Sequence, residues 1–288
     1  MYNSSFQKRI PMHKSFIFFS VLIGLTSSIL AQPLLEKEGL AHSTFVEGGL
    51  VRMDTTTPVL YLMFTGGDYA DGGAFIRKSL KKAKVSAHFF FTGDFYREPS
   101  NQKLIRKLHR EGHYLGPHSD KHLLYASWEN RDSLLVTKEA FLEDLRHNYQ
   151  AMEPFGISPE VGSLFMPPYE WYNQSISNWT RENGQFLINF TPGTRSNADY
   201  TTPDMGRRYL SSEFIYNSIL QYELTQSSGL NGFLLLIHIG THPDRTDKFY
   251  DYLPQLINEL RKRGYRFGKL QETLIRPWRE AIHGSNEP

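Results

Sequence analysis

The feature that most constrains the fold is a regular alternation of strand and helix patterns along the chain. Short apolar runs predict buried strands, and apolar residues at helical spacing between them predict amphipathic helices. Strands are expected at 59–64, 87–91, 114–116, 162–166, 186–190, 233–237 and 265–267, and helices at 73–82, 103–110, 137–152, 173–183, 212–224 and 251–263. Repeated βα units of this kind predict an α/β protein with a parallel sheet.

About seven such units favour a single distorted (β/α) barrel resembling a TIM barrel, and 288 residues suffice for one such domain. An open doubly wound sheet is the alternative. Neither a glycine fingerprint GxGxxG nor a P-loop follows the first strand. In both architectures, functional residues lie just after the carboxyl ends of the strands.

The first 31 residues have the pattern of an export signal. Lys8, Arg9 and Lys14 precede an apolar run at 15–30, which Ala31 follows. A basic region, a short apolar region and a small residue at the cut are typical of a secretory signal peptide. We expect cleavage near Ala31, a single domain at 32–288, and a secreted or periplasmic protein without a stable membrane anchor. An uncleaved anchor is the alternative.

Composition restricts the chemistry. The chain has no cysteine, which excludes disulfides, thiolate zinc sites and a cysteine nucleophile, so a metal site must use histidines and carboxylates. A net charge of +2 argues against a nucleic-acid partner, because binding a phosphate backbone needs clustered Lys and Arg.

Polar and aromatic residues follow several predicted strands. They are Asp68 and Asp71 after the first strand, His118 and His122 after the third, Tyr169, Glu170 and Trp171 after the fourth, Arg195 after the fifth and His238 after the sixth. On one helical turn, two histidines spaced i, i+4 lie on the same side, as metal ligands require. By itself, this spacing is equally compatible with structural histidines. Asp71 is expected to cap the first helix or to belong to the site.

The segment 116–122 matches the H-[ST]-x-x-H motif of the polysaccharide deacetylase family, also called the NodB-homology or carbohydrate esterase family. Other markers follow in that family's order. Residues 62–64 resemble the start of T-F-D-D-G, 165–169 resembles F-R-P-P-Y, and 236–238 resembles L-x-H. The resemblance covers about residues 51–273, and it implies a distorted (β/α) barrel.

The resemblance implies metal-dependent removal of N- or O-acetyl groups from an acetylated carbohydrate. Its metal motif corresponds to His118 and His122, and we choose Asp68 as the third ligand. One divalent ion is expected, zinc first, with nickel or cobalt compatible with such a site. His238 would protonate the leaving group, and the Tyr169 N–H would bind the oxyanion.

The sequence also departs from the family pattern. Thr65 and Gly66 stand where the family has two aspartates, and Met166 stands where it has an arginine. Arg195 is expected to substitute for that arginine, and Asp68 is the nearest carboxylate for catalysis. Glu170 and Trp171, with Tyr169, would form a sugar platform or pack as an ordinary loop.

Three functions compete. The first is a secreted metal-dependent carbohydrate deacetylase. The second is a carbohydrate-binding protein on the same barrel with impaired catalysis, which the altered motifs suggest. The third is a metal-independent glycosidase with a carboxylate pair drawn from Asp68, Glu170 and Asp199.

Overall fold

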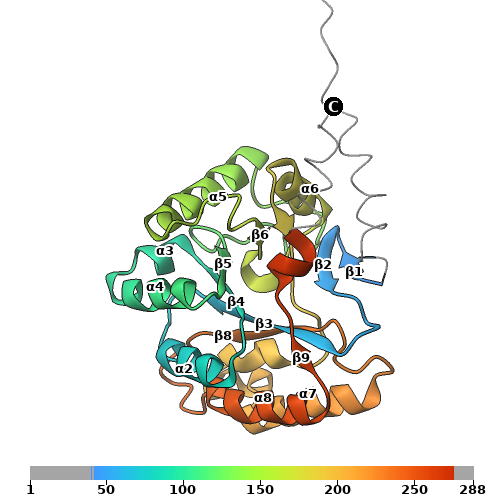
Figure 1. Ribbon diagram of the computed structural model, residues 1–288. Helices are drawn as coiled ribbons and strands as arrows, with labels where there is room; N and C mark the ends of the chain where they lie inside the picture. The colour runs from blue at the N-terminus through green and yellow to red at the C-terminus, as the bar shows by residue number, and fades with distance from the viewer. Residues whose placement is uncertain (1–39, 41, 276–288) are drawn as a thin grey trace, which may run out of the picture.

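A computed structural model describes residue 40 and residues 42–275. Its centre is a parallel sheet around β3 (Val59–Gly66), which pairs with β4 (His88–Phe91), β8 (Leu234–His238) and β9 (Arg266–Phe267). β5 (Tyr114–Pro117) extends the sheet beyond β4. Figure 1 shows these strands in the middle of the molecule. The predicted α/β class and parallel sheet are confirmed.

The remaining strands are short and form two separate two-stranded sheets. β6 (Leu164–Phe165) pairs with β7 (Phe186–Leu187), so the strands predicted at 162–166 and 186–190 shrink to two residues each. β1 (Thr44–Val46) and β2 (Gly49–Arg52) form an antiparallel hairpin that the strand pattern did not predict.

Backbone hydrogen bonds connect these pieces to one another and to the central sheet. The Met166 N–H donates to the Pro117 carbonyl, and the Asn189 N–H donates to the Leu50 carbonyl. The described strands therefore follow one another around a common centre without one continuous ladder. This is consistent with a distorted barrel.

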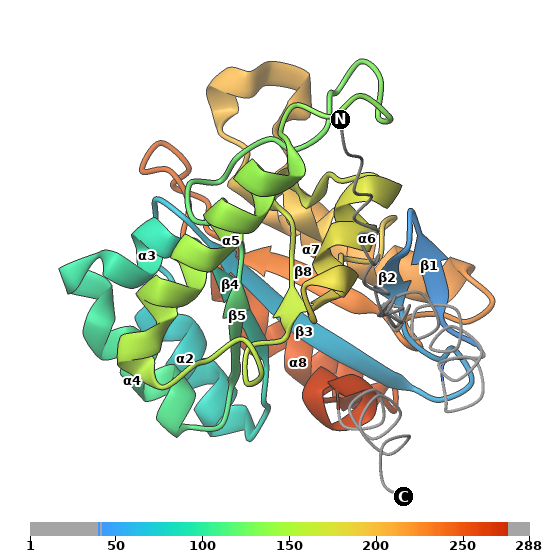
Figure 2. The same ribbon diagram turned by 90° about the horizontal axis from the view of Figure 1, so that it is seen from above.

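Helices cover the outside of the strands, as both ribbon views show (Figures 1 and 2). They are α2 (Gly73–Ala83), α3 (Gly93–Arg97), α4 (Gln102–Arg110), α5 (Lys138–Met152), α6 (Gln174–Glu182), α7 (Ser212–Thr225) and α8 (Leu253–Lys262). Single-turn helices are η1 (Pro99–Asn101), η2 (Glu153–Phe155), η3 (Pro168–Glu170), η4 (Ser196–Tyr200), η5 (Pro203–Arg208), η6 (Phe249–Tyr252) and η7 (Gln271–Ile275). The predicted helices all occur, with ends shifted by up to two residues.

Side-chain caps explain several helix starts. Thr137, Asn173 and Ser211 each accept a hydrogen bond from a backbone N–H in the first turn of α5, α6 and α7. The predicted cap at Asp71 is wrong, since α2 begins after Gly72 without a side-chain cap. The carboxylate of Asp71 instead accepts hydrogen bonds from the Thr241 N–H and the Tyr250 hydroxyl.

The pleat of each strand divides its apolar side chains between two cores. On β3, Leu62 and Phe64 belong to the outer core beneath the helices, whereas Tyr61 and Met63 belong to the inner core between the strands. Alternate residues of a strand face opposite sides, which is why β3 is apolar on both faces. Thr65, two residues beyond Met63, therefore faces the inner side at the carboxyl end.

The segments that follow β5, β7 and β8 gather along the upper edge of Figure 2. These loops therefore stand at the carboxyl end of the sheet, where a parallel sheet places its functional residues. Among the helices of the described part of the chain, none combines the length and the apolar composition needed to span a membrane. The predicted signal peptide at 1–31 lies outside the described residues.

Candidate active site

Strand alternation brings three polar residues to the inner end of the sheet. On β8, Leu234 and Leu236 face the inner core, so His238 follows them on the same side. His238 pairs in register with Thr65 on β3. His118 directly follows β5. The strand ends therefore deliver two imidazoles and one hydroxyl to one place.

His118 and His122 lie close together, with ring centroids 5.1 Å apart. The segment between them is a loop and not the helical turn that the sequence suggested, because Ser119 and His122 both have left-handed backbones. His118 Nδ1 is 2.8 Å from the Met166 carbonyl oxygen, so this nitrogen carries the proton and Nε2 is left as the lone-pair nitrogen. A hydrogen bond of this kind orients metal-binding histidines.

Burial favours the neutral form of both rings. It places the pKa of His118 well below its ordinary value, with a further contribution from the charge of His122. It lowers the pKa of His122 to about 4, where the charge of His238 adds and that of Asp68 opposes. A metal ligand must be a neutral imidazole, so both rings are prepared for that role near pH 7.

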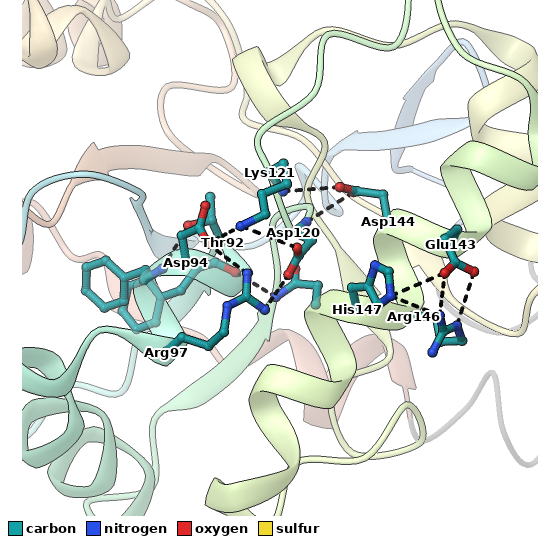
Figure 3. A network of polar contacts seen from close by, with 12 residues as sticks. Thr92, Asp94, Arg97, Asp120, Lys121, Glu143, Asp144, Arg146 and His147 are labelled. Atoms are coloured by element: carbon teal, nitrogen blue, oxygen red, sulfur yellow. Dashed lines mark hydrogen bonds and ion pairs between the residues drawn. The ribbon is translucent and has the colours of Figure 1, made fainter.

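The loop that carries this pair is held by Asp144 of α5 (Figure 3). The Asp144 carboxylate accepts hydrogen bonds from the backbone N–H groups of Asp120 and Lys121 and from the Tyr125 hydroxyl, at 2.9–3.1 Å. On the other side, the Asp120 carboxylate pairs with Arg97 at 2.7 Å. The hydrogen bonds of Asp144 and the ion pair of Asp120 therefore fix a loop with an unusual backbone.

His238 forms a close pair with Asp199 of η4. His238 Nδ1 lies 2.6 Å from Asp199 Oδ1, and the His238 backbone N–H donates to Oδ2 at 2.9 Å. Burial lowers the pKa of His238, but the charges of Asp199 and Glu170 outweigh it, and the net pKa is raised. This imidazole therefore retains its proton more readily than a free histidine does, which suits a proton donor.

Glu170 is a partly buried carboxylate beside that pair. Burial and the charge of Asp199 raise the pKa of Glu170 to about 7, while the charge of His238 opposes them. Glu170 has a left-handed backbone with φ of 53°, and its carbonyl oxygen accepts a hydrogen bond from the Asn189 side chain. A strained, desolvated carboxylate near neutral pKa is a common property of catalytic sites.

Aromatic rings extend the site outward. The Tyr169 ring lies 4.4 Å from the His122 ring and is 46% exposed. The Trp171 ring lies nearby and stacks on Trp128. The ring contact places Tyr169, whose N–H the resemblance assigns to the oxyanion, next to His122.

The structure does not gather the other two predicted residues closely. Asp68 is exposed in the loop after β3, and its charge acts to raise the pKa of His122. Arg195 is exposed before η4, with a left-handed backbone. Among the described residues, no group of three or more His, Asp or Glu lies close enough to hold a metal ion. The described residues therefore supply two neighbouring imidazoles for a metal ion, and no third ligand lies close to them.

The end of β3 shows why the third ligand is missing there. The hydroxyl of Thr65 is buried without a hydrogen-bond partner in the described structure. A side chain at Gly66 would come within 2.7 Å of Ile239 and 2.9 Å of Phe91. The packing at Gly66 therefore leaves no space for the second family aspartate without rearrangement.

Comparison with known proteins agrees with the geometry. The sequence profile of the family described as polysaccharide deacetylase matches residues 52–186, a range that includes both histidines of the loop. This match identifies a polysaccharide deacetylase domain over residues 52–186 and confirms the resemblance found in the sequence. Proteins of this family are hydrolases that act on N-acetyl amide bonds.

Individual relatives and solved structures are also similar to this chain. A peptidoglycan-N-acetylglucosamine deacetylase of Bacillus cereus is 26% identical over 195 residues, which are 68% of this chain and 78% of the relative. The structure of a family 4 pseudoenzyme from Bacillus anthracis has a TM-score of 0.60 and 16% identity, covering 80% of this chain and 70% of its own.

A family 4 acetyl xylan esterase from Clostridium thermocellum, solved with a cobalt ion, is also similar. Its TM-score is 0.56 at 20% identity, and the match covers 75% of this chain and 89% of that one. These likenesses at low identity establish the fold. The deacetylase fold therefore occurs both with a bound metal ion and in a protein described as a pseudoenzyme.

Sequence reasoning missed part of this site. The sequence pattern offers Asp199 only as a glycosidase carboxylate, although it is the partner of His238. It indicates no role for Asp144 or Trp128. The available signal is weak: Asp199 follows the fifth predicted strand by nine residues, and Asp144 is one of several acidic residues on a helix.

Proposed function

We propose that this deacetylase-family protein is an exported, metal-dependent carbohydrate deacetylase that hydrolyses acetyl groups on a sugar polymer. The observation that carries the proposal is the His238–Asp199 pair, with its 2.6 Å contact, beside the neutral pair of His118 and His122. Together they offer a protonated imidazole and two metal-binding imidazoles at one end of the sheet.

His118 and His122 would hold one divalent ion, for which zinc is the first expectation, with Asp68 as the third ligand from the loop after β3. Such an ion polarises a carbonyl oxygen and lowers the pKa of a bound water. The charge of Asp68 on His122 supports its assignment. The glycine pair before Asp68 gives the loop the freedom to approach.

The chain's own residues divide the proton transfers. Glu170, with its pKa of about 7, accepts a proton from water as the water oxygen bonds to the acetyl carbon. The Tyr169 N–H stabilises the charge that develops on the carbonyl oxygen. His238 gives its proton to the sugar nitrogen or oxygen as the bond to the acetyl carbon breaks, and Asp199 stabilises the imidazolium beforehand. The products are acetate and the free sugar group.

The test combines metal content with acetate release from N-acetylglucosamine oligomers, peptidoglycan and acetylated xylan. We expect one metal ion per chain, lost in the His118→Ala/His122→Ala variant, and acetate release that a chelator abolishes. His147→Ala is the matched control, because His147 is a partly exposed histidine of α5 that pairs with Glu143. Asp199→Asn is expected to lower acetate release about 10²–10⁴-fold.

Other outcomes would decide between the alternatives. A protein that binds metal and sugar but releases no acetate from any substrate would be the binding protein. That alternative is favoured by the incomplete metal donor set. Release of reducing ends by the chelated protein would identify a glycosidase.

A further inference from the structure

The loop after the histidine pair carries an aromatic residue that the site as described does not use. Trp128 is 57% exposed, the largest exposed fraction among the aromatic side chains of the described residues. It lies in a short turn closed by an antiparallel bridge between Ala126 and Leu134. Exposed apolar side chains that gather into a patch mark binding sites, and the exposed rings of Trp128 and Tyr169 lie together at the rim of the active site.

Trp128 is held in a fixed stack. Its ring lies 5.3 Å from the Trp171 ring with 28° between the planes, and the Arg131 guanidinium lies 4.5 Å from the centre of the Trp171 ring. Arg131 is itself anchored by a hydrogen bond from Nε to the Tyr172 carbonyl oxygen at 2.6 Å. The Trp171 Nε1–H donates to the Ser127 carbonyl oxygen.

This stack is continuous with the active site. The Trp128 ring lies 5.8 Å from the Tyr169 ring, which in turn lies 4.4 Å from the His122 ring. A sugar that presents its acetyl group to the histidine pair would contact Tyr169, and the next sugar of the same polymer would then reach Trp128. Flat indole faces bind the apolar faces of pyranose rings, while the sugar hydroxyls remain in water.

We propose that Trp128, stacked on Trp171, forms a second sugar subsite that binds the pyranose ring next to the one being deacetylated. The inference rests on the proposed function, because the first subsite is the deacetylation site. It makes the protein selective for an internal or chain-linked sugar over a single one. The preformed stack favours binding, since little side-chain entropy remains to be lost.

The test measures binding of the N-acetylglucosamine tetramer and of the monosaccharide by calorimetry, with chelated protein so that nothing is hydrolysed. Trp128→Ala is expected to weaken tetramer binding about tenfold and to leave monosaccharide binding unchanged. Trp128→Phe should retain most of the affinity. Phe214→Ala is the control, because Phe214 is 53% exposed on α7. Thermal unfolding of each variant checks that the fold is kept.

Several outcomes would overturn the subsite. One is unchanged tetramer binding in Trp128→Ala, and another is equal loss for tetramer and monosaccharide. A third is a shift from dimer to monomer in Trp128→Ala, which would make the surface a contact between two copies of this chain. A wild-type protein that deacetylates the monosaccharide as well as the tetramer would contradict the subsite and leave the proposed function intact. Trp128-dependent binding without acetate release would contradict the proposed function and leave the subsite intact.

Discussion

Among single residues, Glu170 has the most unusual environment of the site. It combines a left-handed backbone, partial burial and the neighbouring charges of Asp199 and His238. A free glutamate has a pKa of 4.5, whereas in the folded protein the pKa of Glu170 is raised to about 7. Because the unfolded chain loses this proton at a lower pH than the folded protein does, Glu170 lowers the free energy of unfolding as the pH rises from about 4 to about 7.

We predict that Glu170→Gln separates catalysis from stability. Glutamine cannot accept the proton, so the rise of acetate release with pH through about 7 should disappear, with a loss of at least about 10²-fold. Because glutamine resembles the protonated acid, the thermal midpoint should rise relative to wild type at pH 8 and change little at pH 4. Both are measured as pH profiles.

Glu182→Gln is the control for this prediction, since Glu182 is exposed and pairs with Lys138 at the surface. A Glu170→Gln variant with the wild-type pH profile of activity would remove Glu170 from the proton-transfer role. Loss of activity together with a lower thermal midpoint at every pH would indicate a structural role instead.

Among the elements, α5 contributes most to the site without containing a catalytic residue. Asp144 projects from this helix to the loop of the histidine pair and accepts hydrogen bonds from two backbone N–H groups (Figure 3). It also accepts a hydrogen bond from the Tyr125 hydroxyl. The neighbouring Glu143 points away and pairs with Arg146 at the surface. Adjacent residues of one helix thus have different tasks because they face different sides of it.

We predict that Asp144→Asn destabilises the protein by about 1–3 kcal/mol. The side-chain N–H₂ of asparagine is itself a donor and would face one of the groups that now donate to Asp144. At least one of these buried donors would then have no acceptor. Glu143→Gln should change stability by less than about 0.5 kcal/mol, because exposed ion pairs contribute little. Urea unfolding measures both. Metal affinity should fall with Asp144→Asn and not with Glu143→Gln. Equal effects of the two substitutions would show that the hydrogen bonds of Asp144 do not position the histidine pair.

For the whole molecule, the histidine pair and the predicted signal peptide support one hypothesis. It is that the protein is an enzyme that acts on polymers outside the cytoplasm. The basic and apolar pattern at 1–31 lies outside the described residues, so the sequence alone supports it.

We predict that the exported protein begins at Gln32. Mass spectrometry of the protein recovered from outside the cytoplasm should show the mass of residues 32–288. Ala31→Arg should block processing, because the cleavage site requires a small residue. Recovery of the unprocessed chain in the membrane fraction would instead indicate an uncleaved anchor.

Local patterns predicted the elements well, and tertiary packing explains the deviations. Strands 59–64 and 233–237 were found because a strand buried on both faces is apolar throughout. The strands at 162–166 and 186–190 shrank to two residues because their ladders depend on partners that the local pattern does not specify. The cap predicted at Asp71 failed because Thr241 and Tyr250, about 170 residues away, bind its carboxylate.

By itself, the sequence determined the α/β class, the position of the histidine motif and the polysaccharide deacetylase family, since all three depend on local patterns and their order. The tertiary structure decided which groups meet. It paired His238 with Asp199, 39 residues away along the chain, and it brought Asp144 to the loop of His118 and His122. It also left Asp68 exposed and placed Trp128 beside Tyr169. Contacts of this kind depend on the packing of several elements at once, and no local stretch of sequence encodes them.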